Sequence, residues 1–134
     1  VVGVSDADTS RIAGRAAVEL AQATGGTVHF VTAVTDGERA VIEIGSDRYV
    51  LDTVDIARVA VQRFVESLGI TVPYTVQAVE DSPAKALVAV AELLDADLIV
   101  VGNVRMQGLG RVLGSVGNDV AHSAPCSVLI VKTV

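Results

Sequence analysis

The strongest constraint on the fold is a regular alternation, along the chain, of short Val-rich apolar runs with longer Ala-rich segments of helical periodicity. Apolar runs without a polar face are typical of strands buried on both sides, and the segments between them are typical of helices that cover a sheet. Strict alternation predicts an α/β fold: a parallel five-stranded sheet between two layers of helices, with right-handed crossovers. The expected strands are residues 1–4, 28–34, 72–79, 98–101 and 128–131.

Four helices are expected between these strands. The first follows a Ser- and Asp-rich turn and begins near Arg11, the second covers about 51–68, the third begins at Ser82-Pro83, and the fourth covers 115–123. Apolar residues at i, i+3 and i+4 spacings predict their buried faces. These faces are Ile12, Ala16, Ala17, Leu20 and Ala23 in the first helix, Ile56, Val59, Ala60, Phe64 and Leu68 in the second, and Ala86, Leu87, Val90, Ala91 and Leu94 in the third.

Residues 35–50 do not follow the alternation. Asp36-Gly37 predicts a turn. Residues 41–44 are compatible with a short extra strand or with a mobile loop, and the sequence leaves both alternatives open.

Size and charge narrow the function. With 134 residues, the chain is expected to form a single domain over residues 1–134, stable without a disulfide or a metal. The net charge of −6 and the scattered basic residues argue against nucleic-acid binding. Cys126 is the only cysteine, so no intramolecular disulfide can form. No bilayer-length apolar stretch and no signal-peptide pattern occurs, and we expect a cytoplasmic protein that does not bind membranes.

Residues that could perform catalysis or bind a metal do not cluster along the chain. His29 and His122 stand apart from other ligand-type side chains, whereas structural metal sites use about four grouped ligands. Ser115 has no evident His–Asp partners, and Cys126 is interpreted as a small packed residue. We therefore expect no catalytic residue, no metal site and no enzymatic role, with weak ATP hydrolysis left open.

A glycine-rich segment follows the fourth expected strand. Gly102 comes directly off that strand, and Gly114-Ser115 comes directly before the last helix. Glycines let backbone N–H groups approach an anion, and a helix N-terminus adds free donors, so the segment could hold phosphates with help from Arg105 and Arg111. The alternative is that the glycines only form tight turns and Ser115 only caps its helix. The segment is neither a Walker A loop nor a dinucleotide fingerprint.

Longer stretches of the chain resemble the universal stress protein family. The similar segments are the spacing from Gly102 to Gly114-Ser115, the run Ala124-Pro125-Cys126-Ser127 with the strand after it, Asp81-Ser82-Pro83-Ala84, residues 96–103, and the opening Val1-Val2-Gly3-Val4. Together they cover nearly the whole chain except residues 35–50.

The resemblance implies an adenine nucleotide alpha hydrolase-like fold with strand order 3-2-1-4-5. It also implies that ATP or another adenine nucleotide binds between the first and fourth strands, and Mg²⁺ is the metal ion that would accompany the nucleotide. Phosphates and ribose would meet the last motif residues, and the base would lie near the ends of the first two strands. The implied nucleotide-binding residues are Gly3, Val4, Ser5, Asp6, Ala33, Val101, Gly102, Arg105, Gly114, Ser115 and Val116.

Two residues depart from the family pattern. Arg105 stands where the family has its second motif glycine, and Ser5 stands where the family usually has Asp. Arg105 would either pair with a phosphate or block the approach of the loop. Ser5 removes a carboxylate contact to the nucleotide unless Asp6 replaces it.

Other functions were weighed against this resemblance. A receiver domain is also a five-stranded α/β unit, but it needs an Asp where this chain has Gly102. The His-x-Gly-His and Ser-Gly-Gly-x-Asp-Ser signatures of nucleotidyl transferases and ATP pyrophosphatases are absent. The remaining alternative is a universal stress domain that does not bind nucleotide and acts as a dimeric protein-interaction module.

The last expected strand predicts self-association. The run Val128-Leu129-Ile130-Val131 is apolar on both faces and would lie at the edge of the sheet, where unpaired backbone groups invite another strand. The family resemblance implies the same contact, with the last strands of two copies paired antiparallel across a two-fold axis. We therefore expect a homodimer through Val128 to Val131, and a further protein partner that the sequence does not identify.

Overall fold

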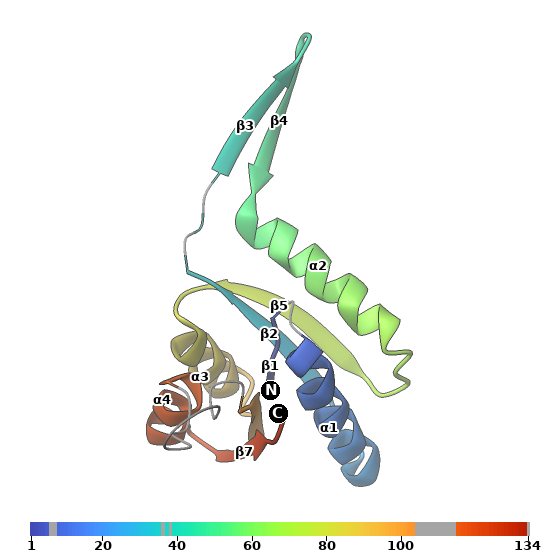
Figure 1. The fold of residues 1–134 in the computed structure, drawn as a ribbon, viewed down its shortest axis with the longest axis vertical. Helices are drawn as coiled ribbons and strands as arrows, with labels where there is room; N and C mark the ends of the chain where they lie inside the picture. Colours follow the sequence, from blue (N-terminus) through green and yellow to red (C-terminus); the bar gives the residue numbers. More distant parts are fainter. Residues whose placement is uncertain (6–7, 36, 38, 104–114, 134) are drawn as a thin grey trace.

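The computed structural model describes residues 1–5, 8–35, 37, 39–103 and 115–133. Its centre is a parallel five-stranded sheet with the order β5-β2-β1-β6-β7 (Figure 1). The strands are β1 (Val2–Gly3), β2 (Val28–Val34), β5 (Tyr74–Glu80), β6 (Leu98–Gly102) and β7 (Ser127–Val131). Counted without the two strands of a separate hairpin, this order is 3-2-1-4-5, so the predicted fold class and strand order are confirmed.

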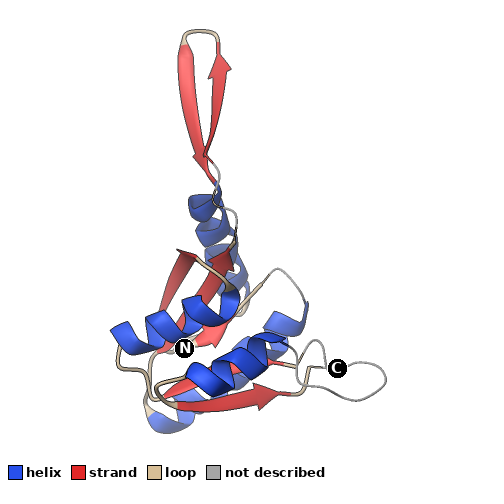
Figure 2. Cartoon of the chain, turned by 90° about the vertical axis from the view of Figure 1, so that its left-hand side faces the viewer, coloured by secondary structure: helices blue, strands red, loops and turns tan. Residues whose placement is uncertain are grey.

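Helices cover both faces of the sheet (Figure 2). The described helices are α1 (Asp8–Thr24), α2 (Thr53–Ser67), α3 (Pro83–Leu93) and α4 (Ser115–Ser123). Buried residues of α1 and α2 pack in one apolar cluster, and those of α3 and α4 pack in a second. The sheet therefore forms the middle layer of a three-layer arrangement.

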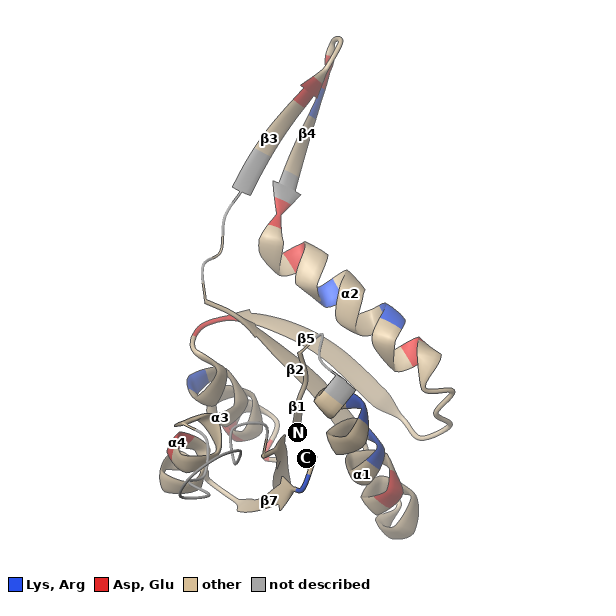
Figure 3. Cartoon of the chain, in the orientation of Figure 1, with Lys and Arg blue, Asp and Glu red and all other residues tan. Residues whose placement is uncertain are grey.

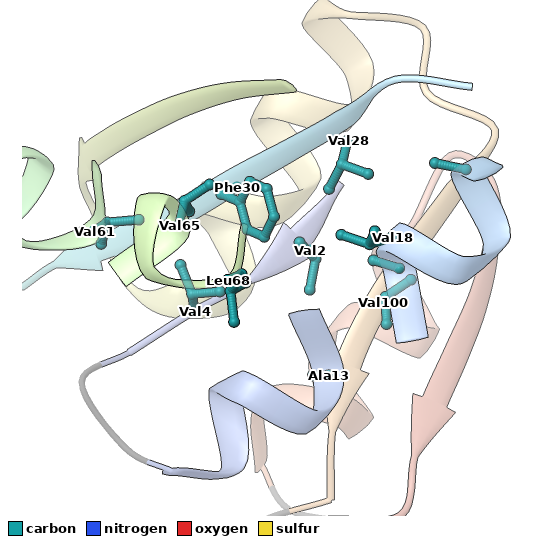
Figure 4. Packing of buried hydrophobic residues seen from close by; sticks show 12 residues of the cluster. Val2, Val4, Ala13, Val18, Val28, Phe30, Val61, Val65, Leu68 and Val100 are labelled. Carbon is teal, nitrogen blue, oxygen red and sulfur yellow. The ribbon is translucent and has the colours of Figure 1, made fainter. Parts of the chain in front are cut away.

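Neighbouring strand residues supply the two cores. Phe30 and Val100 belong to the cluster under α1 and α2 (Figure 4), whereas Val31, Ile99 and Val101 belong to the cluster under α3 and α4. Successive side chains of a strand point to opposite faces. A sheet covered on both faces thus requires strands that are apolar throughout, which is the pattern seen in the sequence.

The buried face of α1 differs from the predicted one. Of the predicted face, Ile12, Leu20 and Ala23 are exposed. The buried residues are Ser10, Ala13, Gly14, Ala17, Val18 and Ala21. A Cβ added at Gly14 would lie only 3.5 Å from Cε1 of Phe30, so the helix meets the sheet through its smallest side chains. The close approach of α1 to the sheet therefore favours burial of its small residues. The prediction that Ile12 and Leu20 lie on the buried face was wrong.

The predicted face of α2 is correct only toward the C-terminal end of the helix. Leu68 is buried and Phe64 packs against the core, but Ile56, Val59 and Ala60 are exposed. Figure 1 shows the first turns of α2 beside the hairpin and its last turns along the sheet. The first half of the apolar face therefore has no sheet beneath it. In α3, the predicted face is buried except for Leu94, which follows the helix.

Residues 39–52 form the hairpin, with strands β3 (Arg39–Ile44) and β4 (Asp47–Asp52). It projects away from the three-layer body (Figures 1 and 2). Ile44 pairs with Asp47 across a tight turn in which Gly45 has a φ of 65°, a conformation that favours glycine. Of the two alternatives for residues 41–44, the structure shows a strand. The predicted Asp36-Gly37 turn lies partly outside the described residues, which do not include Asp36.

Candidate functional site

A cavity of about 350 Å³ lies at the carboxyl ends of β1 and β6, where the strand order reverses. The turn after β1, the end of β2, and helices α1, α3 and α4 contribute its walls. Its lining residues are Gly3, Val4, Ser5, Thr9, Ser10, Ala13, Val31, Thr32, Ala33, Pro83, Ala86, Leu87, Val101, Gly102, Ser115, Val116 and Gly117. In open parallel sheets, this is the position at which ligands usually bind.

Most residues predicted to contact a nucleotide lie together in this cavity. These are Gly3, Val4, Ser5, Ala33, Val101, Gly102, Ser115 and Val116. The other predicted residues, Asp6, Arg105 and Gly114, lie outside the described residues. The structure thus brings together segments from four parts of the chain, and their contact with a nucleotide stays a prediction.

The described lining combines apolar walls with hydroxyl groups. The hydroxyl-bearing residues are Ser5, Thr9, Ser10, Thr32 and Ser115, and none of the described lining residues is charged. Small-molecule sites commonly have this composition, with a few polar groups that orient a ligand against an apolar surface. None of the described lining residues carries a carboxylate, so none of them would repel a phosphate.

Ser10 fixes the turn that follows β1. Its Oγ accepts a hydrogen bond from the Ser5 backbone N–H at 2.8 Å, and it lies 3.2 Å from Oγ of Ser5. Because Ser10 is buried in the first turns of α1, it holds Ser5 against the helix. The residue that replaces the family's usual Asp is therefore oriented by a second hydroxyl.

Thr9 carries a polar group without a partner. Its Oγ1 is buried and forms no hydrogen bond with the described part of the chain, although Thr9 lines the cavity. A buried hydroxyl that lacks a hydrogen bond is costly, and a polar ligand atom could satisfy it. Thr9 is thus a candidate contact that the sequence analysis did not single out.

Sequence reasoning also missed Ser10, Thr32 and Leu87 as lining residues. Ser10 was interpreted only as part of a helix start, and Leu87 only as a core residue of α3. Thr32 had a usable signal, because it is a polar residue in the second half of the expected strand 28–34, whose other polar residue, His29, lies near the opposite end. A polar side chain near the carboxyl end of a buried strand is favoured where a ligand or a turn meets it.

Glycine is favoured at two lining positions because side chains of other elements approach the backbone closely. A Cβ at Gly3 would lie 3.1 Å from Cδ1 of Leu87, and a Cβ at Gly102 would lie 3.0 Å from Cγ2 of Thr133. Thr133 is itself held by Asn103. The Asn103 Oδ1 accepts a hydrogen bond from the Thr133 backbone N–H at 2.6 Å and another from the Thr133 Oγ1 at 3.0 Å. These contacts fix the end of β6 at the wall of the cavity.

The titratable group of His29 lies near the start of β2, away from the cavity at its other end. Partial burial lowers the pKa of His29 below its usual value of 6.5. Its Nδ1 lies 2.7 Å from Oγ1 of Thr75 on β5. Its environment indicates a neutral, structural histidine.

The described residues form neither a metal-ligand cluster nor a membrane-spanning helix. No group of three or more His, Cys, Asp or Glu side chains in this part of the chain is placed to hold a metal ion. Among the helices formed by the described residues, none has the length and apolar character needed to cross a membrane.

A parallel sheet with this strand order, covered by helices on both faces, defines a three-layer α/β domain. The sequence profile of the universal stress protein family matches residues 1–132. The chain therefore belongs to the universal stress protein family.

Curated relatives match parts of the chain. A universal stress protein of Methanothermobacter thermautotrophicus is 44% identical over 55 residues, which is 41% of this chain and 38% of the relative. A universal stress protein of Mycobacterium tuberculosis is 49% identical over 53 residues, 39% of this chain and 36% of the relative. These matches thus span less than half the length of either relative.

Solved structures match almost the whole fold. A universal stress protein crystallised in complex with cAMP is 29% identical, has a TM-score of 0.69, and matches 99% of this chain and 94% of its own. The Archaeoglobus fulgidus universal stress protein in complex with dAMP is 22% identical, has a TM-score of 0.66, and matches 98% of this chain and 94% of its own. The second likeness is one of fold alone.

Proposed function

We propose that this protein binds an adenine nucleotide in the cavity between β1 and β6 and acts as a regulatory module rather than as an enzyme. The observation that carries the proposal is the gathering of eight predicted nucleotide-contacting residues around one cavity at the reversal of strand order. The volume of about 350 Å³ lies in the range of roughly 300–1,000 Å³ found for small-molecule sites. The likeness to a relative in complex with cAMP supports the same ligand class.

The lining suggests how each part of a nucleotide would be held. Val31, Ala33 and Leu87 form an apolar surface suited to the base. Ser5 and the unpartnered Thr9 hydroxyl would meet the ribose. Phosphates would lie at the N-terminus of α4, where Ser115 and free backbone N–H groups provide donors. Any Mg²⁺ would be held by phosphates and water rather than by the described lining residues, none of which is acidic.

Titration calorimetry with ATP, ADP, AMP and cAMP tests this proposal. Ser115→Ala removes a hydrogen bond to a charged group and should weaken binding by about 1.5 kcal/mol, roughly tenfold in Kd. Ser123→Ala, at the exposed far end of the same helix, is the matched control and should leave Kd unchanged. Absence of binding heat from all four nucleotides would refute the proposal.

Arg105 decides whether the departure from the family motif helps or hinders binding. A guanidinium that pairs with phosphate predicts weaker binding in Arg105→Ala. A side chain that blocks the loop predicts instead that Arg105→Gly strengthens binding. The two variants are compared in the same titrations.

Assembly is the second part of the proposal. Within the described sheet, β7 pairs only with β6, and its other edge faces outward (Figure 1). Leu129 on this strand is exposed, and the strand contains no charged residue. These features support a homodimer in which two copies of β7 pair antiparallel. The domain would then act in the cytoplasm as a dimer.

One observation favours the alternative of an interaction module without nucleotide. Ser5 replaces the acidic residue usual in the family, and its hydroxyl is already within hydrogen-bond distance of Ser10. A nucleotide contact through Ser5 would compete with that bond. If calorimetry detects no nucleotide while the protein remains dimeric, this alternative explains the fold.

A further inference from the structure

The hairpin and the start of α2 concentrate exposed apolar side chains. Seven of the twelve exposed large hydrophobic residues in the described chain lie between residues 41 and 59, so the distribution is not an even scatter. They are Val41, Ile42, Ile44, Tyr49, Val50, Ile56 and Val59. A concentration of this kind in a soluble domain marks a contact surface.

The hairpin cannot derive much stability from its own two strands. Isolated two-stranded hairpins are at best marginally stable in water. In this register Val41 pairs with Val50, and Glu43 pairs with Arg48, so these four residues share one face of the hairpin. We call this face the inner face because Val50, which is 60% exposed, also lines the groove described next. Ile42, Ile44 and Tyr49 share the outer face.

A groove of about 360 Å³ joins the inner face to α2. Its lining residues are Val50, Asp52, Asp55, Ile56, Val59, Ala60 and Arg63. This is the half of the apolar face of α2 that the sequence pattern predicted to be buried and that the sheet does not reach. The exposed half of this apolar face is thus flanked by Asp55 at one end and by Arg63 at the other.

The hairpin cannot close this groove within its own chain. β4 ends at Asp52 and α2 begins at Thr53, so no linker allows the hairpin to fold back on the helix. Asp52 also caps the helix, because its Oδ1 accepts a hydrogen bond from the Val54 N–H at 2.9 Å. The hairpin and α2 thus form two sides of an open corner, which is visible in Figure 1.

The charges around the corner are self-complementary. Figure 3 shows acidic and basic residues on both the hairpin and α2. Glu43 and Arg48 lie on the inner face, and Asp55 and Arg63 line the groove. In the described part of the chain, none of these four side chains forms an ion pair. In a two-fold contact, Arg48 of one copy would meet Asp55 of the other copy. Glu43 of the first copy would meet Arg63 of the other.

We propose that a second copy of this chain covers the inner face and the groove, with the inner face of each hairpin lying in the groove of the other copy. The contact is isologous, because the same surface serves both copies, and this is the commonest geometry of homodimers. It buries the valines of the hairpin against Ile56 and Val59, and it pairs charges that are unpaired within one copy. It does not involve β7 or the nucleotide cavity, so it stands independently of the proposed function.

Sedimentation analysis in a Leu129→Lys background tests the proposal, because this substitution removes the proposed contact through β7. The Leu129→Lys protein should still dimerise at tens of micromolar. Adding Arg48→Glu should weaken the dimer at least tenfold, and adding Asp55→Arg to that variant should restore it. A folded Leu129→Lys protein that is monomeric, or a loss that Asp55→Arg does not rescue, would overturn the proposal.

Disulfide trapping supplies a second, face-specific readout in a Cys126→Ser background. A Val41→Cys chain mixed with a Val59→Cys chain should form a disulfide-linked heterodimer on oxidation. An Ile44→Cys chain is the matched control, because Ile44 lies on the outer face, and it should cross-link much less. Equal cross-linking from both faces, or none from the inner face, would contradict the arrangement.

Discussion

Gly3 faces the cluster under α3 and α4, Gly14 faces the cluster under α1 and α2, and the two positions leave very different space for a side chain. A Cβ at Gly3 would lie 3.1 and 3.3 Å from the methyl carbons of the buried Leu87, whereas a Cβ at Gly14 would meet Phe30 and Leu68 at 3.5 and 3.7 Å. The first separations are tighter than normal contacts, and the second are ordinary. The two glycines therefore have different reasons for being present.

Substitution by alanine should have opposite effects at these two positions. Gly3→Ala should lower the free energy of unfolding by about 1–3 kcal/mol through overpacking against Leu87. Gly14→Ala should raise it by about 0.5–1 kcal/mol, because alanine favours the helical conformation and meets no clash. Urea denaturation of both variants measures the difference, and equal shifts in midpoint would contradict this account.

The residues of the candidate site could be predicted wherever a backbone requirement left a trace in the sequence. Gly102 and Ser115 flank a strand end and a helix start, and both line the cavity. Thr9 and Ser10 could not be assigned from the sequence, because a hydroxyl residue at a helix start is equally suited to capping. Only the three-dimensional structure shows that Ser10 bonds to Ser5 and that Thr9 Oγ1 has no hydrogen-bond partner among the described residues.

Helix starts differ in how they are capped. The sequence predicted that α3 begins at Ser82-Pro83, and Ser82 does occupy the N-cap of α3, but the Ser82 side chain forms no capping hydrogen bond. Instead, Oδ1 of Asp81 accepts a bond from the Ser82 N–H at 2.8 Å. At α2, which begins two residues later than predicted, Asp52 provides a side-chain cap.

These caps predict unequal costs of substitution. Asp52→Ala should destabilise the protein by about 1 kcal/mol, because it leaves the Val54 N–H without its acceptor. Ser82→Ala should change the free energy of unfolding by only a few tenths of a kcal/mol. Thermal and urea unfolding of the two variants provide the comparison. A larger loss in Ser82→Ala than in Asp52→Ala would show that the caps have been assigned wrongly.

The helix faces show where periodicity fails as a guide. On α1 the buried stripe is displaced because Ala13, Gly14 and Ala17 allow the closest approach to the sheet. On α2 the predicted stripe continues past the sheet to Ile56 and Val59. Periodicity reports which side chains can be buried, whereas the extent of the sheet decides which are buried within one copy of the chain.

At the scale of the whole molecule, the sequence predicted the sheet well because its central strands are covered on both faces. Burial on both sides requires apolar residues at every position of β6 and almost every position of β2, which makes them easy to recognise. The hairpin gave a weaker signal, because it lies outside the body and has no buried face of its own. Apolar neighbours such as Val41 and Ile42 in β3, or Tyr49 and Val50 in β4, point to opposite faces, so the hairpin has no single apolar face that a pattern could reveal.

The two edges of the sheet differ in a way that predicts which one associates. β7 has the sequence Ser-Val-Leu-Ile-Val without charge, whereas β5 ends in Glu80 and lies under α2. An uncharged apolar edge invites a partner strand, and a lysine on an edge opposes one. In an Arg48→Glu background, which removes the hairpin contact, the remaining dimer should therefore dissociate when Leu129 is changed to Lys.

Gln77→Lys on β5 is the matched substitution for this measurement, since it places the same charge on the opposite edge of the sheet. It should leave the dimer intact in sedimentation equilibrium at tens of micromolar. Val131 accepts a hydrogen bond from the Asn103 N–H and so faces β6, which leaves the N–H of its neighbour Ile130 at the free edge of β7. Ile130→Pro therefore tests the backbone contribution, because proline removes an N–H that a partner strand would need. Persistence of the dimer in both Leu129→Lys and Ile130→Pro, with the fold retained by circular dichroism, would show that β7 is not the edge through which two copies pair.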